Sequence, residues 1–213
     1  MENISDYITE VAPNEIEKRS FEIIEEELKL ELDPIKKPII KRVIHTTADF
    51  SYAESLCFSE NAVELALDAI KNGASIVTDT NRGKSGINKK ALEKFGGQVY
   101  CFMADEDVAE KAKESGVTRA TISMEKSAQM NEDFIYAIGN APTALISLYK
   151  LIEEQKIAPK LIIGVPVGFV NVVEAKELIM KAKVPYIVAR GRKGGSNVAA
   201  AICNALIYQL GRD

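Results

Sequence analysis

The sequence contains one histidine, His45, only three cysteines and no tryptophan. Cys57, Cys101 and Cys203 are odd in number and far apart, so a disulfide framework is not expected, and a reducing, cytoplasmic setting follows. A single histidine without paired cysteines gives poor support for a zinc site. The composition therefore argues against a disulfide-rich fold and against the common zinc centres.

Long apolar runs and an excess of positive charge are also missing. No run approaches the roughly 20 apolar residues that a membrane-spanning helix needs, and the acidic start "MENISDYITE" is unlike a signal peptide. The 27 Lys and Arg residues are outnumbered by 31 Asp and Glu residues, which gives a net charge of −4. This balance does not favour general nucleic-acid binding. Neither a membrane nor a nucleic acid is therefore an expected partner.

The 213 residues, 46% of them hydrophobic, are enough for one domain with a sizeable core. Apolar residues recur at helical spacing in residues 14–32, before the turn "DPIKKP". Beyond this turn, short β-branched runs alternate with segments of helical period. We expect strands at residues 39–44, 75–78, 98–102, 134–138, 161–165 and 186–189. The segment 103–133 is expected to hold one helix and then a short strand or turn.

This alternation, with almost entirely apolar strands, predicts an α/β fold. We expect a doubly wound, mainly parallel sheet with helices on both faces, which is a Rossmann-like three-layer sandwich with an added N-terminal helix. The whole chain, 1–213, is predicted to be a single domain. Within it, residues 1–36 form an N-terminal helical extension and residues 37–213 form the α/β core.

Ligands of parallel sheets bind beyond the carboxyl ends of the strands. The segments expected at that edge are "HTT", "DTNRGKSG", "GNAPTA", "GVPVGFVN" and "RGRKGGS". Glycine and proline are common in all such turns, so each loop alone is ambiguous. Together the loops carry the cations Arg82, Lys84, Arg190, Arg192 and Lys193. Solvated surface charge is the alternative for each, but the set predicts a crevice for a substrate with several carboxylates.

His45 is expected directly after the first strand, at this edge. Histidine can give or take a proton near neutral pH without a metal, and the hydroxyls of Thr46 and Thr47 could orient its ring or contact substrate. A purely structural histidine is the alternative. There is no GxSxG motif, and Cys57 lies in the unremarkable "SLCFS". We therefore expect a proton donor or acceptor without covalent catalysis.

Nucleotide-binding motifs are incomplete in this chain. Thr78 stands where a P-loop ending in Gly83-Lys84-Ser85 would have its first glycine. The loop "RGRKGGS" opens a helix and suits an anion, but it is not GxGxxG. A Rossmann-like transferase using a nucleotide or S-adenosylmethionine remains an alternative, and Asp79 would then hold a ribose.

Four longer segments carry a resemblance to a known family. These are "IHTTADFSY", "GNAPTAL", "GVPVGFVNVVEAK" and "GRKGGSNVAAAICNAL", in this order. Together they resemble the precorrin-8X methylmutase family, also called cobalt-precorrin-8 methylmutase, and "IEKRSFEIIEEE" is similar to that family's opening helix. The resemblance runs from about residue 14 to 210. One loop departs from it, because Arg82-Gly83 stands where family members more often have a methionine and an apolar neighbour.

The resemblance implies an isomerase of cobalamin biosynthesis. Such an enzyme moves a methyl group from C-11 to C-12 of precorrin-8, giving hydrogenobyrinic acid, or cobyrinic acid when cobalt is present. It implies that His45 is catalytic and that Arg19, Ser20 and Arg119 contact substrate. The remaining expected substrate-binding residues are Thr46, Arg82, Asn140, Pro142, Thr143, Gly164, Gly168, Arg190, Gly194, Gly195 and Ser196.

A methyl shift around a conjugated ring resembles a 1,5-sigmatropic rearrangement, which requires no redox cofactor, metal ligand or nucleophile from the protein. We therefore expect no cofactor, and any cobalt would arrive already chelated in the corrinoid substrate. The resemblance also implies a homodimer with sites near the subunit interface, and transient handover of substrate between neighbouring pathway enzymes is expected. A non-catalytic corrinoid carrier is the remaining alternative.

Overall fold

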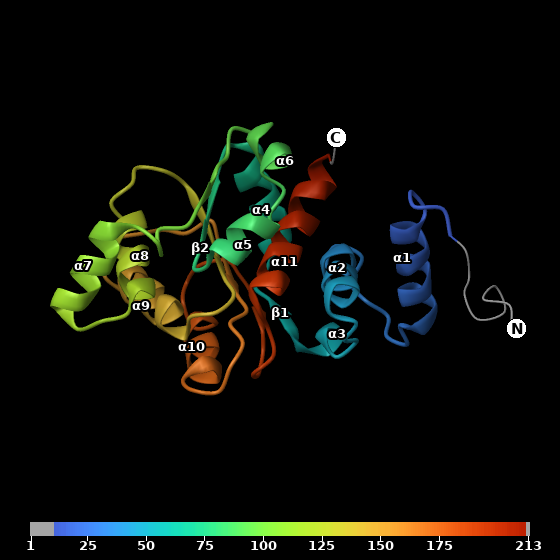
Figure 1. Cartoon of the computed structure of the whole chain (residues 1–213). Coiled ribbons are helices and arrows are strands. Elements are labelled where there is room, and N and C mark those ends of the chain that lie inside the picture. Colours follow the sequence, from blue (N-terminus) through green and yellow to red (C-terminus); the bar gives the residue numbers. More distant parts are fainter. Residues whose placement is uncertain (1–10, 212–213) are drawn as a thin grey trace, which may run out of the picture.

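The structure, a computed structural model, describes residues 11–211 (Figure 1). The helices are α1 (Ile16–Glu27), α2 (Lys37–Thr47), α3 (Tyr52–Ser55), α4 (Ala62–Lys71), α5 (Asn81–Gly86), α6 (Lys89–Glu93), α7 (Glu106–Ser115), α8 (Arg119–Ser127), α9 (Pro142–Glu153), α10 (Val172–Ile179) and α11 (Ser196–Leu210). The strands are β1 (Leu56–Phe58), β2 (Ser75–Thr78), β3 (Val99–Tyr100), β4 (Phe134–Ile138), β5 (Leu161–Gly164) and β6 (Tyr186–Ala189).

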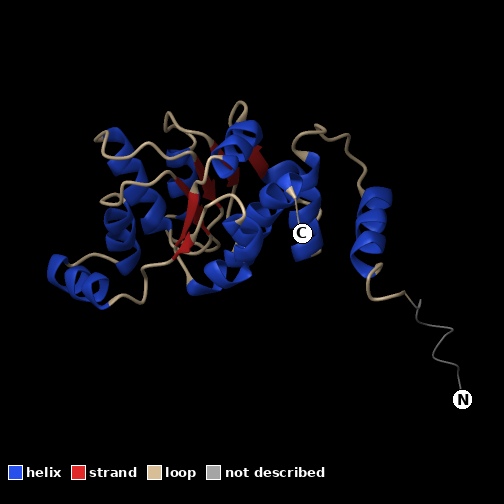
Figure 2. Cartoon of the chain, turned by 90° about the horizontal axis from the view of Figure 1, so that it is seen from above, coloured by secondary structure: helices blue, strands red, loops and turns tan. Residues whose placement is uncertain are grey.

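The strands form one sheet in the order β1-β6-β5-β4-β2-β3. Strand β1 pairs with β6 in antiparallel orientation, and the other neighbours are parallel. Helices α2, α4, α5, α6 and α11 lie on one face of the sheet, and α7 to α10 lie on the other (Figures 1 and 2). A buried apolar core fills the space on each side. The predicted three-layer α/β sandwich is confirmed.

The N-terminal helix α1 lies outside this sandwich, beyond α2 (Figure 1). Its inner face carries Ile24, which is buried, and Phe21, which is partly buried against the same core, as is Leu28 directly after the helix. Its opposite face leaves Ile16 and Ile23 exposed. Among residues 11–211, no helix has the length and apolar character needed to cross a membrane.

The first predicted strand is wrong, because residues 39–44 belong to helix α2. The buried residues of this helix are Ile39, Ile40, Val43 and Ile44. Their spacing matches the 3.6-residue period of a helix, and Pro38 in the first turn suits a helix start. Although β-branched residues favour strands, burial of one apolar face of this segment against the core stabilises the helix here.

The sheet still has six strands, because residues 56–58 form strand β1, which was not predicted, whereas residues 39–44 form none. Strand β1 has only three residues, and its partner in the sheet, residues 187–189, is far away in the sequence. The segment 103–133 also differs from the prediction, because a second helix, α8, follows α7 where a short strand or turn was expected. Thr118 caps α8 by accepting a hydrogen bond from the Thr121 N–H at 3.2 Å.

Candidate active site

The carboxyl ends of β2, β4, β5 and β6 meet at one edge of the sheet, and the loops that follow them are joined by hydrogen bonds. Asp79, directly after β2, accepts hydrogen bonds from the backbone N–H groups of Gly139, Asn140 and Ala141 at 2.9, 2.8 and 2.6 Å. Thr80 donates to Ser196 Oγ at 2.8 Å. These contacts place Asn140 and Ser196, both predicted site residues, on adjoining loops.

The same contacts overturn a role that the sequence left open for Asp79. Its side chain is only 1% exposed, and both carboxylate oxygens accept backbone hydrogen bonds. Burial raises the pKa of the Asp79 carboxyl, while the three N–H donors oppose that rise. The alternative in which Asp79 would hold a ribose is therefore not supported, because both carboxylate oxygens are already engaged inside the protein, and the transferase loses the residue on which it rested.

The two glycine-rich loops pack closely against each other. Gly195 N–H donates to Val165 O at 2.9 Å, and Gly168 N–H donates to Arg192 O at 3.2 Å. A Cβ at Gly194, where φ is +158°, would lie 2.0 Å from Val165 O. Close backbone packing therefore requires glycine at position 194. This agrees with the alternative explanation of the loop, in which its glycines serve the turn and not a ligand. Gly164 is likewise buried inside β5, where a Cβ would lie 3.2 Å from Val188.

Helices α8 and α9 bring two further predicted site residues, Arg119 and Thr143, close to this edge. The hydroxyl groups of Thr118 and Thr143 are 2.8 Å apart, so Arg119 at the start of α8 lies beside the first turn of α9, which begins at Pro142. Both threonines line a cleft of about 920 Å³ between the two helices. Arg119 is exposed and forms no ion pair with any residue in 11–211.

His45 lies in the last turn of α2 and is exposed to solvent. The turn after this helix is held to the loop after β6, because Lys193 Nζ binds Asp49 Oδ2 at 2.7 Å and Ser51 Oγ at 2.9 Å. Lys193 also holds the pKa of the Asp49 carboxyl below its usual range. Although His45 does not follow a strand, its helix ends next to the loop after β6.

An aromatic ring of α1 packs against the imidazole of His45. The Phe21 ring stacks on the imidazole with a centroid distance of 5.1 Å and an interplanar angle of 19°. The Arg42 guanidinium lies 4.7 Å from the centroid of the same Phe21 ring and binds Glu17. Sequence reasoning missed Phe21, although its place beside Ser20 in "RSFEII" was visible.

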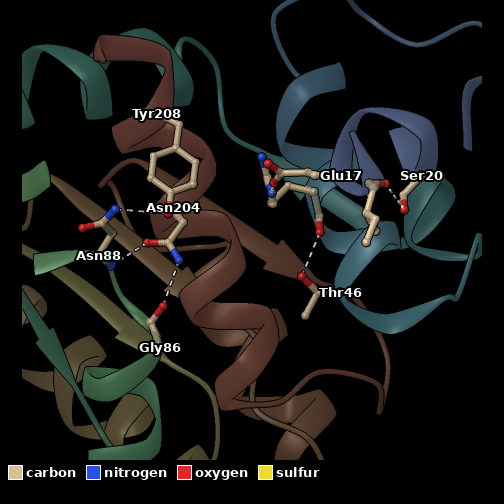
Figure 3. Close-up of polar contacts among 9 residues, drawn as sticks. Glu17, Ser20, Thr46, Gly86, Asn88, Asn204 and Tyr208 are labelled. Carbon is tan, nitrogen blue, oxygen red and sulfur yellow. Dashed lines mark hydrogen bonds and ion pairs between the residues drawn. The ribbon is translucent and has the colours of Figure 1, made fainter. Parts of the chain in front are cut away.

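The hydroxyl groups of the predicted site residues in α1 and at the end of α2 are engaged within their own helices (Figure 3). Ser20 Oγ donates to Ile16 O at 2.8 Å, and Thr46 Oγ1 donates to Arg42 O at 3.0 Å. Thr47 does the same with Val43 O at 2.8 Å. The threonine hydroxyls therefore do not orient the imidazole. The sequence had left that role open for them.

The predicted cations divide into engaged and free groups. Arg190 binds Glu177 through Nε at 2.8 Å and through Nη2 at 3.3 Å. The Arg192 guanidinium lies 5.4 Å from the centroid of the Phe169 ring. Arg19 pairs with Glu22 and Glu26 on α1. Arg82, by contrast, is exposed and pairs with no acidic residue of the described chain.

The helix that carries Arg82 is fixed against α11 by asparagine side chains (Figure 3). Asn204 accepts from Asn88 N–H at 2.8 Å and donates to Gly86 O at 2.8 Å. Asn88 Nδ2 also lies 3.3 Å from the Tyr208 hydroxyl. This network holds the end of α5 in place, although the loop departs from the expected family pattern.

No group of three His, Cys, Asp or Glu residues in the described part of the chain could hold a metal ion. The three cysteines are unpaired. Lys176, by contrast, is a buried charged residue that sequence reasoning did not single out, although it lies in the quoted segment "GVPVGFVNVVEAK".

Comparisons with known proteins agree on one family. The sequence model described as precorrin-8X methylmutase matches residues 15–209. The chain is 45% identical over 197 residues to a cobalt-precorrin-8 methylmutase of Priestia megaterium, covering 92% of this chain and 88% of the relative. It is 43% identical over 209 residues to a protein of the same name from Leptospira interrogans, covering 94% of each.

A solved structure gives the same result. The crystal structure of the precorrin-8x methyl mutase from Thermus thermophilus matches with a TM-score of 0.84 and 38% sequence identity, covering 91% of this chain and 96% of that chain. The family model, the curated relatives and the solved fold each span nearly the whole chain. The chain therefore belongs to the precorrin-8X methylmutase family.

Proposed function

We propose that this chain is an isomerase of cobalamin biosynthesis that moves a methyl group from C-11 to C-12 of cobalt-precorrin-8, giving cobyrinic acid. The family match over residues 15–209 carries this proposal. The cobalt-containing substrate is favoured over precorrin-8 because both curated relatives described above carry it in their names. A non-catalytic carrier would bind the corrinoid without relocating its methyl group.

In the proposed reaction His45 gives or takes a proton on the conjugated ring system. A proton or strong hydrogen bond at the ring redistributes charge, which favours migration of the methyl group to the adjacent carbon. General acid–base catalysis of this kind contributes about 10²–10⁴-fold in rate. The exposure of His45 supports the role, because a large substrate can reach the imidazole, and the stacked Phe21 ring limits its orientation.

The remaining rate enhancement comes from holding a flat polycarboxylate in a reactive conformation. Arg82 and Arg119 are the best candidates for gripping carboxylate arms, because they are exposed and unpaired among residues 11–211. Arg190 already has a carboxylate partner in Glu177, which a substrate arm would have to displace. We propose no cofactor for this chemistry, since cobalt would be part of the substrate.

A homodimer would complete this site. His45 and Ser20 lie with α2 and α1 on one side of the sheet, whereas Arg119 lies with α8 on the other side (Figure 1). The loop after β5 leaves Phe169 and Val170 79% and 78% exposed, which is unusual for apolar side chains of a lone subunit. We propose that a second copy covers this apolar surface. Handover from neighbouring cytoplasmic pathway enzymes would protect the substrate.

The test is to incubate the purified protein with cobalt-precorrin-8 and precorrin-8 in parallel. The expected result is a product with the methyl group at C-12, identified by NMR, with the faster rate on the cobalt substrate. Tight binding without methyl relocation would instead establish a carrier. A rate that depends on added S-adenosylmethionine would establish a transferase, and the proposed isomerase would then be rejected.

A further inference from the structure

Lys176 is a completely buried lysine without an acidic partner. Its side chain rises from α10, has 0% exposure and forms no ion pair with any residue in 11–211. Its Nζ donates to Gly191 O at 2.7 Å and to Lys193 O at 2.8 Å. Burial of an ammonium group costs free energy unless hydrogen bonds compensate, so these two carbonyl groups are what keep the amine there.

Both carbonyl groups belong to the short loop between β6 and α11. In a trans peptide the C=O of one residue and the N–H of the next point in opposite directions. Because Lys176 draws the carbonyl groups of Gly191 and Lys193 toward itself, the N–H groups of Arg192 and Gly194 point away from it. Within residues 11–211 neither N–H has a hydrogen-bond acceptor. Two donors are therefore available to a carboxylate.

The loop that Lys176 holds also connects the other parts of the candidate site. Arg192 O accepts a hydrogen bond from Gly168 N–H in the loop after β5. Lys193 Nζ binds Asp49 and Ser51, in the turn after the helix of His45. A change in this loop would therefore reach both neighbouring segments.

We propose that Lys176 is a positioning residue, which fixes the loop 191–194 in the conformation that binds a carboxylate arm of the corrinoid without touching the substrate itself. The identity of the anion rests on the proposed function. The claim that Lys176 organises the loop is independent of that function. The burial of Lys176 lowers its pKa to about 8, and even a neutral amine keeps two N–H donors for the two carbonyl groups.

The test compares the wild type with Lys176→Met, which keeps the length of the side chain and removes the donors. We expect the KM for cobalt-precorrin-8 to rise by about tenfold, the value of one hydrogen bond to a charged group, while kcat changes much less. Hydrogen exchange of the Gly168 and Gly195 amides, whose hydrogen bonds join this loop to the loop after β5, should become faster. A lysine with only a structural role would lower stability and leave the KM of the folded enzyme unchanged.

Lys181→Met is the matched control, since Lys181 is exposed two residues beyond the end of α10. It should leave KM and both amides unchanged. If Lys176→Met does not fold, Lys176→Gln, which keeps one amide donor group, is measured against the same criteria. Unchanged KM, or a raised KM with unchanged exchange at Gly168 and Gly195, would overturn the proposal. Failure of the wild type to convert the substrate would reject the proposed function alone, because the exchange experiment needs no substrate.

Discussion

The single histidine is the residue whose importance the sequence indicated most directly. Its alternative role was that of a structural histidine, for which burial in the core would be expected. The structure places His45 on the surface of α2, in contact with the Phe21 ring. A structural role in the core is thereby excluded, while the catalytic role stays a prediction.

We predict that His45→Ala loses turnover and keeps its affinity for the corrinoid. Removing a general acid or base should lower kcat by about 10²–10⁴-fold, while the carboxylate contacts remain. Single-turnover rates measure the first effect, and titration of the visible spectrum of cobyrinic acid measures the second. Wild-type kcat in the His45→Ala protein would show that the proton comes from another group.

At the scale of helices and strands, local pattern predicted most elements and failed where contacts are distant. Strands β2, β4, β5 and β6 were predicted because each is a short run rich in β-branched or other apolar residues. Strand β1 was missed because only its pairing with β6 makes three residues a strand. Helix α8 was missed because several of its buried residues are small and polar, among them Ser123 and Ser127. Such residues weaken the hydrophobic periodicity on which the prediction relied.

Asp79 joins the end of β2 to the start of α9, and we predict that Asp79→Asn destabilises the protein. The amide would place an NH₂ group against backbone N–H donors and lose charge-assisted hydrogen bonds. We expect the free energy of unfolding in urea to fall by about 2–4 kcal/mol. Asp68→Asn is the control, since Asp68 is exposed on α4, and it should change stability by no more than about 0.5 kcal/mol. Equal stability of the two variants would show that the carboxylate charge of Asp79 is unimportant.

At the scale of the whole molecule, the sequence predicted which loops share an edge but not which side chains join them. The rule that parallel strands end together placed the loops after β2, β4, β5 and β6 correctly. The contacts between Thr80 and Ser196, and between Lys193 and Asp49, join segments more than 100 residues apart. No local pattern predicts such pairs. The turn after the helix of His45 is held to the loop after β6 in the same way, through Lys193 and not through a strand.

The buried charge of Lys176 should also affect the pH dependence of stability of the whole protein. Its pKa is lowered from 10.5 to about 8 in the folded state, because burial disfavours the ammonium form. Between these values the unfolded chain binds a proton that the folded chain does not, so stability rises with pH in this window. A shift of this size corresponds to about 3 kcal/mol.

We therefore predict that the wild type gains stability relative to Lys176→Met as the pH rises from 7 to 10. The difference between the two free energies of unfolding removes the contributions of the other titrating groups, which both proteins share. Urea unfolding at pH 7, 8.5 and 10 and constant salt measures it, and the expected gain is about 2–3 kcal/mol. A difference that stays constant with pH would mean that the Lys176 amine titrates alike in both states. Burial would then not disfavour its charge, and hydrogen bonding to Gly191 O and Lys193 O would have to offset the whole cost of removing it from water.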